Sequence, residues 1–174
     1  MKRSGIQVMA SLVGLVKPLT GYMGLAVLLG LLGQLCATAI TVLGGFAVLH
    51  TLGMEQRLAL WALFLLIGLC ALLRGVLRYG EQTCNHFIAF KLLALLRDRV
   101  FAVLRRLCPA KLEGKNKGDL ISVITSDIEL LEVFYAHTIS PICIAALYTL
   151  ISAAFLSLCH PILGGITLLA HGTV

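Results

Sequence analysis

Charge is scarce in this chain and is missing from long parts of it. Only 13% of the 174 residues are charged, whereas 59% are hydrophobic. No charged side chain occurs between Lys17 and Glu55, and none occurs from Val133 to Val174. A soluble domain has about a quarter of its residues charged. The composition therefore excludes a soluble globular domain and predicts an integral membrane protein embedded in a lipid bilayer.

Several motifs of soluble chemistry are also missing. The six cysteines contain no C-x-x-C pair, so zinc and redox motifs are not indicated and no metal site is predicted. No G-x-x-x-x-G-K-[ST] stretch occurs, so the sequence given lacks the loop that cradles nucleotide phosphates and is not expected to hydrolyse ATP alone. Neither a base-stacking surface nor a reading helix is evident, so nucleic acid is not an expected partner.

The positive charge that is present is unevenly placed. Ten of the fourteen Lys and Arg residues lie within 74–117, and three more precede the first apolar block, in 1–18. Lys and Arg near the ends of spans mark the cytoplasmic side. This predicts a cytoplasmic N-terminal segment, 1–18, and a cytoplasmic region over 79–137. Ala37-Thr38-Ala39 looks like a signal cleavage site, but the apolar run continues past it, which favours an uncleaved span.

The apolar runs predict an all-α bundle whose helices extend into the cytoplasm. Spans are expected at about 19–49, 57–107, 119–158 and 162–174, within a partial transmembrane domain over 19–174. The second and third are too long for the hydrocarbon core, which about 20 helical residues cross, so each carries a cytoplasmic extension. The fourth is too short to cross, which favours a truncated chain. No nucleotide-binding domain is expected within these residues.

On the cytoplasmic extension of the second span, apolar residues recur at spacings of three and four: Leu93, Leu96, Val100, Val103 and Leu107. This spacing predicts a seam like that of a coiled coil.

The segment between the second and third spans contains helix breakers. Pro109 lacks a backbone donor, and Gly114, Asn116 and Gly118 are turn formers. Asp119 then suits the N-cap of a new helix. Because short connections join neighbouring helices, we expect two antiparallel cytoplasmic helices linked by an exposed basic turn.

This layout resembles the transmembrane domain of ABC exporters, which have six long helices per subunit. Gly118-Asp119-Leu120-Ile121-Ser122, followed by Asp127, resembles the G-[DE]-L-L-S-R-x-x-x-D opening of the family's third helix. Val123 stands where that pattern has arginine. The family resemblance implies that the second and third helices reach a partner ATPase domain through a short coupling helix.

Two further stretches form a pattern: Arg78-Tyr79-x-Glu81, followed by Asn85-His86 and Ala89-Phe90-Lys91-Leu92-Leu93, and Ile139-Ser140-Pro141-Ile142. The first is similar to R-Y-x-E-R-x-x-S-H-D-x-x-F-R and the second to a third-helix run, both of the cytochrome bd assembly exporters, the thiol-reductant (cysteine and glutathione) type. Gln82 and Phe87 depart from the pattern. This resemblance implies export of cysteine or glutathione across a bacterial inner membrane.

The same resemblance implies three further features. ATP would be bound by a nucleotide-binding domain outside these residues, and the second transmembrane subunit would make a heterodimer. The coupling turn to the ATPase domain would comprise Pro109, Ala110, Lys111, Leu112, Glu113, Gly114, Lys115, Asn116 and Lys117.

Individual side chains suggest two sites. Arg74 and Arg78 lie four apart on one helix face, where they either attract an anionic or zwitterionic cargo or extend to the lipid headgroups. Glu81, three residues after Arg78, is placed to neutralise it. His86 matches a position that is associated with haem in the resembled group, and imidazole is a common ligand of haem iron. The resemblance therefore implies that His86 binds haem. The alternative is a hydrogen-bonded histidine at the membrane interface.

Two other functions stay open on the sequence. The chain could be a stand-alone haem-binding or assembly-scaffold membrane protein that acts without ATP. It could also be an inactive truncated gene product.

Overall fold

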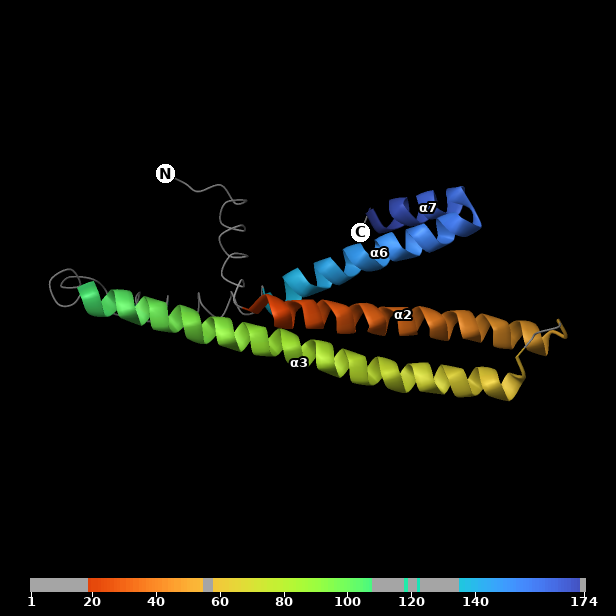
Figure 1. The fold of residues 1–174 in the computed structure, drawn as a ribbon, viewed down its shortest axis with the longest axis horizontal. Coiled ribbons are helices and arrows are strands. Elements are labelled where there is room, and N and C mark those ends of the chain that lie inside the picture. The colour runs from red at the N-terminus through yellow and green to blue at the C-terminus, as the bar shows by residue number, and fades with distance from the viewer. Residues whose placement is uncertain (1–18, 55–57, 108–117, 119–121, 123–134, 173–174) are drawn as a thin grey trace. The chain divides into compact units, whose positions relative to one another are not determined.

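The computed structural model describes residues 19–54, 58–107, 118, 122 and 135–172. Its elements in chain order are α2 (Thr20–Thr51), α3 (Leu60–Leu107), the π-helix η3 (Tyr135–Ile139), α6 (Ser140–Cys159) and α7 (Pro161–Gly172) (Figure 1). The described part of the chain contains no strand. The predicted all-α fold is confirmed.

Three of these helices are long and apolar enough to cross a membrane. They are Thr20–Thr51, Leu60–Arg106 and His137–Cys159, with mean hydropathies of 2.1, 2.3 and 2.2, and α7 is a shorter apolar helix. The 48 residues of α3 form one unbroken helix, about 72 Å long at 1.5 Å per residue. That is more than twice the roughly 30 Å of hydrocarbon in a bilayer. The chain is therefore a multi-pass membrane protein.

The end of α2 is fixed by its backbone. Gly53 has a φ of 79°, a left-handed conformation that glycine adopts without strain. The Met54 N–H donates to the Leu49 carbonyl (3.2 Å), and the Gly53 N–H donates to the His50 carbonyl (3.1 Å). These two bonds make the Schellman motif, which satisfies carbonyls at a helix C-terminus. The local sequence thus stops α2 where the chain must turn towards α3.

The chain divides into two units, one of which comprises 26–82 and 141–174. In this unit α2 and α3 run antiparallel, side by side (Figure 1). Glycines allow the close approach: a Cβ added at Gly80 would lie 3.1 Å from Leu29 Cδ1, and one at Gly33 would lie 3.7 Å from the Leu77 Cβ. Small residues have this role between membrane helices, where lipid supplies no hydrophobic driving force for association.

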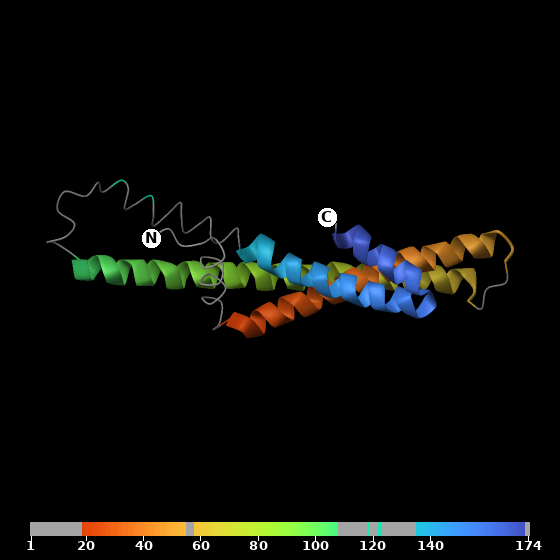
Figure 2. The same cartoon turned by 90° about the horizontal axis from the view of Figure 1, so that it is seen from above.

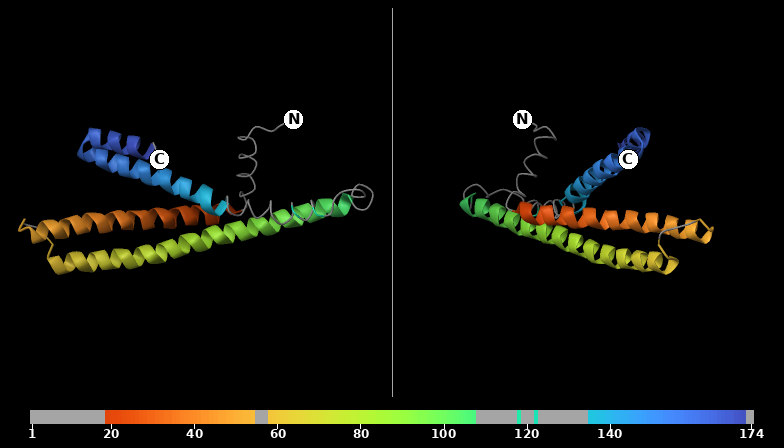
Figure 3. Two further views of the ribbon diagram at one scale, coloured as in Figure 1. Left: turned by 180° about the vertical axis from the view of Figure 1, so that it is seen from behind. Right: turned by 45° about the vertical axis from the view of Figure 1, so that its right-hand side comes forward.

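Helices α6 and α7 form a hairpin in the same unit (Figures 2 and 3). The turn lies where the sequence predicts it, at Cys159-His160-Pro161. The His160 N–H donates to the Leu156 carbonyl (2.9 Å), while His160 Nδ1 accepts from the Ile162 N–H (3.3 Å). Pro161 is the first residue of α7, a position that needs no N–H donor. These groups close the hairpin with a single residue between the two helices.

The other unit comprises 1–25 and 83–140. Its buried apolar residues on α3 are Ile88, Ala89 and Leu92. The Tyr22 ring of α2 packs against the Phe87 ring, with centroids 4.7 Å apart. Such tilted pairs add about 0.5–1.5 kcal/mol beyond the area that they bury.

The predicted coiled-coil seam does not coincide with the buried face of α3. Leu93, Leu96 and Val100 are only half-buried, and Val103 is 56% exposed. The spacing of three and four recurs on more than one helix face, so it could not decide which face is covered.

The start of α6 also differs from expectation. The sequence predicts one continuous span over 119–158, whereas a π-helical turn, Tyr135–Ile139, precedes α6. Pro141 has no N–H, so the carbonyl of His137 loses its α-helical donor. A wider π turn is one way in which a helix accommodates such a break.

Candidate functional site: a polar cavity among the membrane helices

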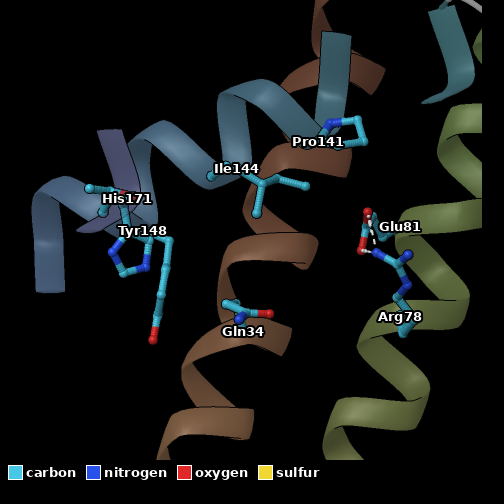
Figure 4. Close-up of a pocket in the computed structure, with 9 residues that line it drawn as sticks. Gln34, Arg78, Glu81, Pro141, Ile144, Tyr148 and His171 are labelled. Carbon is cyan, nitrogen blue, oxygen red and sulfur yellow. Dashed lines mark hydrogen bonds and ion pairs between the residues drawn. The ribbon is translucent and has the colours of Figure 1, made fainter. Parts of the chain in front are cut away.

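A polar cavity lies among α2, α3, α6 and α7 (Figure 4). Its volume is about 330 Å³, and an adjoining cavity between α2 and α3 has a volume of about 280 Å³. The first is lined by Gln34, Arg78, Glu81, Pro141, Ile144, Ala145, Tyr148, Thr149 and His171, and the second by Gly30, Gly33, Gln34, Arg74, Arg78 and Glu81. Three side chains, Gln34, Arg78 and Glu81, line both. Small-molecule sites start at roughly 300 Å³, so this space suits a small solute.

An ion pair stands where the two cavities meet. Arg78 Nη1 donates to Glu81 Oε1 at 2.8 Å and to Glu81 Oε2 at 2.7 Å. The two ends differ in environment, because the Glu81 side chain is 3% exposed and the Arg78 side chain is 62% exposed. A buried carboxylate needs a charged partner. The prediction that Glu81 neutralises Arg78 is confirmed.

The space for the Glu81 carboxylate is provided by a glycine on α2. A Cβ at Gly30 would lie 3.0 Å from Glu81 Cδ and 3.1 Å from Glu81 Oε2, and it would overlap Ile144 Cδ1 of α6. Gly30 is therefore the point where α2, α3 and α6 come together around one acidic group. A residue with any side chain there would have to displace one of these neighbours.

Arg74 lies one helical turn before Arg78 on α3 and lines the smaller cavity. It makes no ion pair or hydrogen bond with the residues that the structure describes. The structure thus brings the two predicted arginines to one polar space, where Arg78 is paired and Arg74 is not. The cavity therefore carries one uncompensated positive charge.

The opposite wall of the larger cavity carries neutral polar groups. Tyr148 Oη and Thr38 Oγ1 are hydrogen-bonded at 2.8 Å, and the Tyr148 ring lies 6.4 Å from the His171 ring. His171 Nδ1 lies 3.0 Å from the Thr167 carbonyl oxygen. A carbonyl can only accept, so Nδ1 carries the proton, and Nε2 of a neutral ring remains an acceptor. Cations on one side and neutral hydrogen-bonding groups on the other can hold a small solute with an acidic end.

Sequence reasoning missed the neutral part of this site. Gln34, Tyr148, Thr149 and His171 line the larger cavity but were not predicted to do so. For Gln34 a signal existed, because it is the one amide side chain in the apolar run 19–49. A polar side chain within a membrane helix usually faces a cavity or a partner.

The remaining predicted site residues lie elsewhere. His86 is exposed on α3, in the unit formed by 1–25 and 83–140. Its ring centroid is 6.1 Å from that of Phe90 and 6.3 Å from that of His137. The predicted coupling turn, 109–117, lies outside the described residues.

Comparison with known proteins identifies the family to which the membrane helices belong. No protein-family model matches the chain. It is 49% identical over 145 residues to a probable ABC transporter ATP-binding/permease protein of Haemophilus influenzae, and the match covers 83% of this chain. The chain contains an ABC exporter transmembrane region. It spans about a quarter of that relative's length, 26%.

Two further relatives of this ABC exporter region are weaker matches. They are the glutathione/L-cysteine transport system ATP-binding/permease proteins CydC of Haemophilus influenzae and of Escherichia coli K12. The chain is 34% identical to the first over 68 residues and 33% identical to the second over 72 residues. These matches cover 39% and 41% of this chain, and 12% and 13% of the relatives.

Proposed function

We propose that this chain is the membrane-spanning part of an ATP-driven exporter. Binding and hydrolysis of ATP in a nucleotide-binding domain outside these residues would drive a small solute out of the cytoplasm. The observation that carries the proposal is the 49% identity to an ATP-binding/permease protein. The polar cavity among its apolar helices supports it, because polar groups in membrane helices are costly and usually mark a solute pathway.

The proposed solute is cysteine or glutathione. Two relatives are named as glutathione/L-cysteine transport systems. Both solutes carry carboxylate groups and polar donors. Arg74, unpaired among the described residues, suits a carboxylate, and the hydroxyl and imidazole groups of Tyr148 and His171 suit the polar remainder.

The proposed coupling route is the turn 109–117, which would sit against the ATPase domain. Motion of that domain would pass through the turn into the two helices that it joins, because packed helices move as stiff bodies. The membrane is proposed to be the bacterial inner membrane, with the N-terminus in the cytoplasm. The second transmembrane subunit is proposed to be a different chain, so that the pathway lies in a heterodimer.

The test is ATP-dependent uptake by everted membrane vesicles from native cells with and without the gene. With the gene, labelled glutathione or cysteine accumulates when ATP is present, and accumulation disappears in the deletion strain. Arg74→Ala reduces uptake, whereas Arg99→Ala, an exposed arginine of α3 outside both cavities, does not. Equal uptake by deletion and parent vesicles would refute the exporter proposal and favour an inactive gene product.

The coupling turn needs a separate measurement. Leu112 is the large apolar residue of this turn, so Leu112→Asp should weaken its contact with the ATPase domain. ATP hydrolysis then continues in the vesicles while solute uptake falls. Arg99→Ala, on α3 outside the turn, serves as the control and leaves uptake near the parent level. Loss of neither activity in Leu112→Asp would argue against coupling through this turn.

Haem binding is a second candidate function with one observation in its favour. The His137 ring of η3 lies 6.3 Å from the His86 ring of α3, nearly perpendicular to it, so two imidazoles lie close together. These two residues would hold the iron, and the haem would supply redox chemistry. The purified protein should then show a Soret band that His86→Ala and His137→Ala each abolish and His160→Ala retains. A spectrum without a Soret band after growth with excess haem would remove this candidate.

A further inference from the structure

The two cavities are lined by more positive than negative side chains. Among the lining residues, two are cationic, Arg74 and Arg78, and one is anionic, Glu81. Glu81 holds Arg78 through both carboxylate oxygens at 2.8 and 2.7 Å. One excess positive charge therefore remains, and it belongs to Arg74.

Helix packing alone does not explain why residue 81 is a glutamate. Its carboxylate is buried against Gly30, where a Cβ would lie 3.1 Å from Oε2. The same residue lines both cavities. Helix association alone would be served by an apolar residue at this place, since a buried charge, even when paired, is seldom more stabilising than apolar packing of equal volume. The charge at this position therefore requires an explanation in terms of the cavity.

We propose that Glu81 is a specificity-determining residue that sets the excess charge of the cavity at +1 and thereby selects cargo with one excess negative charge. The proposal rests on the proposed function, because it concerns the same cavity. It adds a rule for discrimination: the cavity distinguishes solutes of equal size by their charge. Glutathione has one excess negative charge at neutral pH when both carboxylates are ionised, the amine is protonated and the thiol is neutral.

The rule makes a graded prediction for three forms of the cavity. Glu81→Gln leaves two excess positive charges, the parent has one, and Arg74→Gln has none. A unit charge near a protein surface changes the binding of another charge by about tenfold or more at contact distances. The preference for an anionic over a neutral probe should therefore rise about tenfold in Glu81→Gln and fall about tenfold in Arg74→Gln.

The experiment uses two probes of nearly equal size. One is glutathione and the other is glutathione with its glycine carboxylate converted to an amide, which is neutral overall. Binding of each labelled probe to the purified native gene product in nanodiscs, without nucleotide, gives the ratio of the two Kd values. Asn85→Ala is the control, because Asn85 is buried on α3 but lines neither cavity, so its ratio stays at the parent value.

Two variants protect the test against misfolding. Glu81→Asp retains the charge and should keep a ratio near that of the parent. Arg74 is exposed, so Arg74→Gln tests the rule even where Glu81→Gln does not fold. An unchanged ratio in Arg74→Gln or in folded Glu81→Gln overturns the proposal, as does the absence of saturable binding of both probes to the parent. Failure of the exporter function is recognised separately, by vesicles whose ATP-dependent uptake does not depend on the gene.

Discussion

Replacement of Gly30 by alanine tests the packing on which the cavity depends. The added Cβ would overlap Ile144 Cδ1 and approach Glu81 Cδ to 3.0 Å. Real Cβ atoms do not make such contacts, so the Ile144 side chain or the Glu81 carboxylate must shift. Overpacking of this kind typically costs 1–3 kcal/mol. Gly33→Ala is the matched control, because its Cβ would lie 3.7 Å from Leu77 Cβ, an ordinary van der Waals distance.

The comparison of these two variants isolates the contact. Both glycines lie inside α2, so the gain in helix propensity on replacing glycine by alanine, about 1 kcal/mol, is common to both. The difference in stability should therefore be about 1–3 kcal/mol. For a chain of 174 residues that corresponds to about 2–12 °C in Tm, with Gly30→Ala the lower.

The assay is thermal unfolding of the purified protein in nanodiscs, followed by circular dichroism at one heating rate. The double variant Gly30→Ala with Ile144→Val removes the Cδ1 atom that the new methyl group would overlap, and it should recover part of the lost Tm. A Tm for Gly30→Ala equal to or above that of Gly33→Ala would refute the assigned packing of α2 against α3 and α6.

Three further predictions concern other contacts. Gly164→Ala should lower the Tm by several degrees relative to Gly165→Ala, because a Cβ at the first position would lie 2.9 Å from a backbone carbonyl of α6 and at the second would meet nothing within 4 Å. Tyr148→Phe removes the 2.8 Å hydrogen bond to Thr38 and should cost about 0.5–1.5 kcal/mol, measured by the same unfolding assay. Phe87→Leu loses the 4.7 Å ring pair with α2 and should cost about 0.5–1.5 kcal/mol; an unchanged Tm would contradict this.

The helices themselves could be predicted from the sequence because the rule behind them is local. Lipid cannot hydrogen-bond to the backbone, so an apolar run of sufficient length must be helical. The apolar runs of the sequence therefore indicate helices where α2, α3, α6 and α7 lie. The pairing of Arg78 with Glu81 was also predictable, since residues three apart on a helix are neighbours.

Other features depended on how the helices approach one another. That Gln34, Tyr148 and His171 line one cavity follows from the rotation of α2, α6 and α7 about their axes, which no single helix specifies. The same holds for the covered face of α3, where apolar residues at helical spacing surround most of the helix. The π turn before Pro141 was missed because proline predicts a break in the hydrogen-bond ladder but not the form in which the backbone accommodates it.

The short spacing of the Arg78 and Glu81 pair has a consequence for membrane insertion. Membrane helices insert individually and associate afterwards. The two residues lie within one turn of α3, so their charges can be paired before any neighbouring helix arrives. Helix α3 can therefore enter the bilayer with this acidic group already neutralised. The later docking of α2, with Gly30 over the carboxylate, then buries an acidic group that is already paired rather than a bare charge.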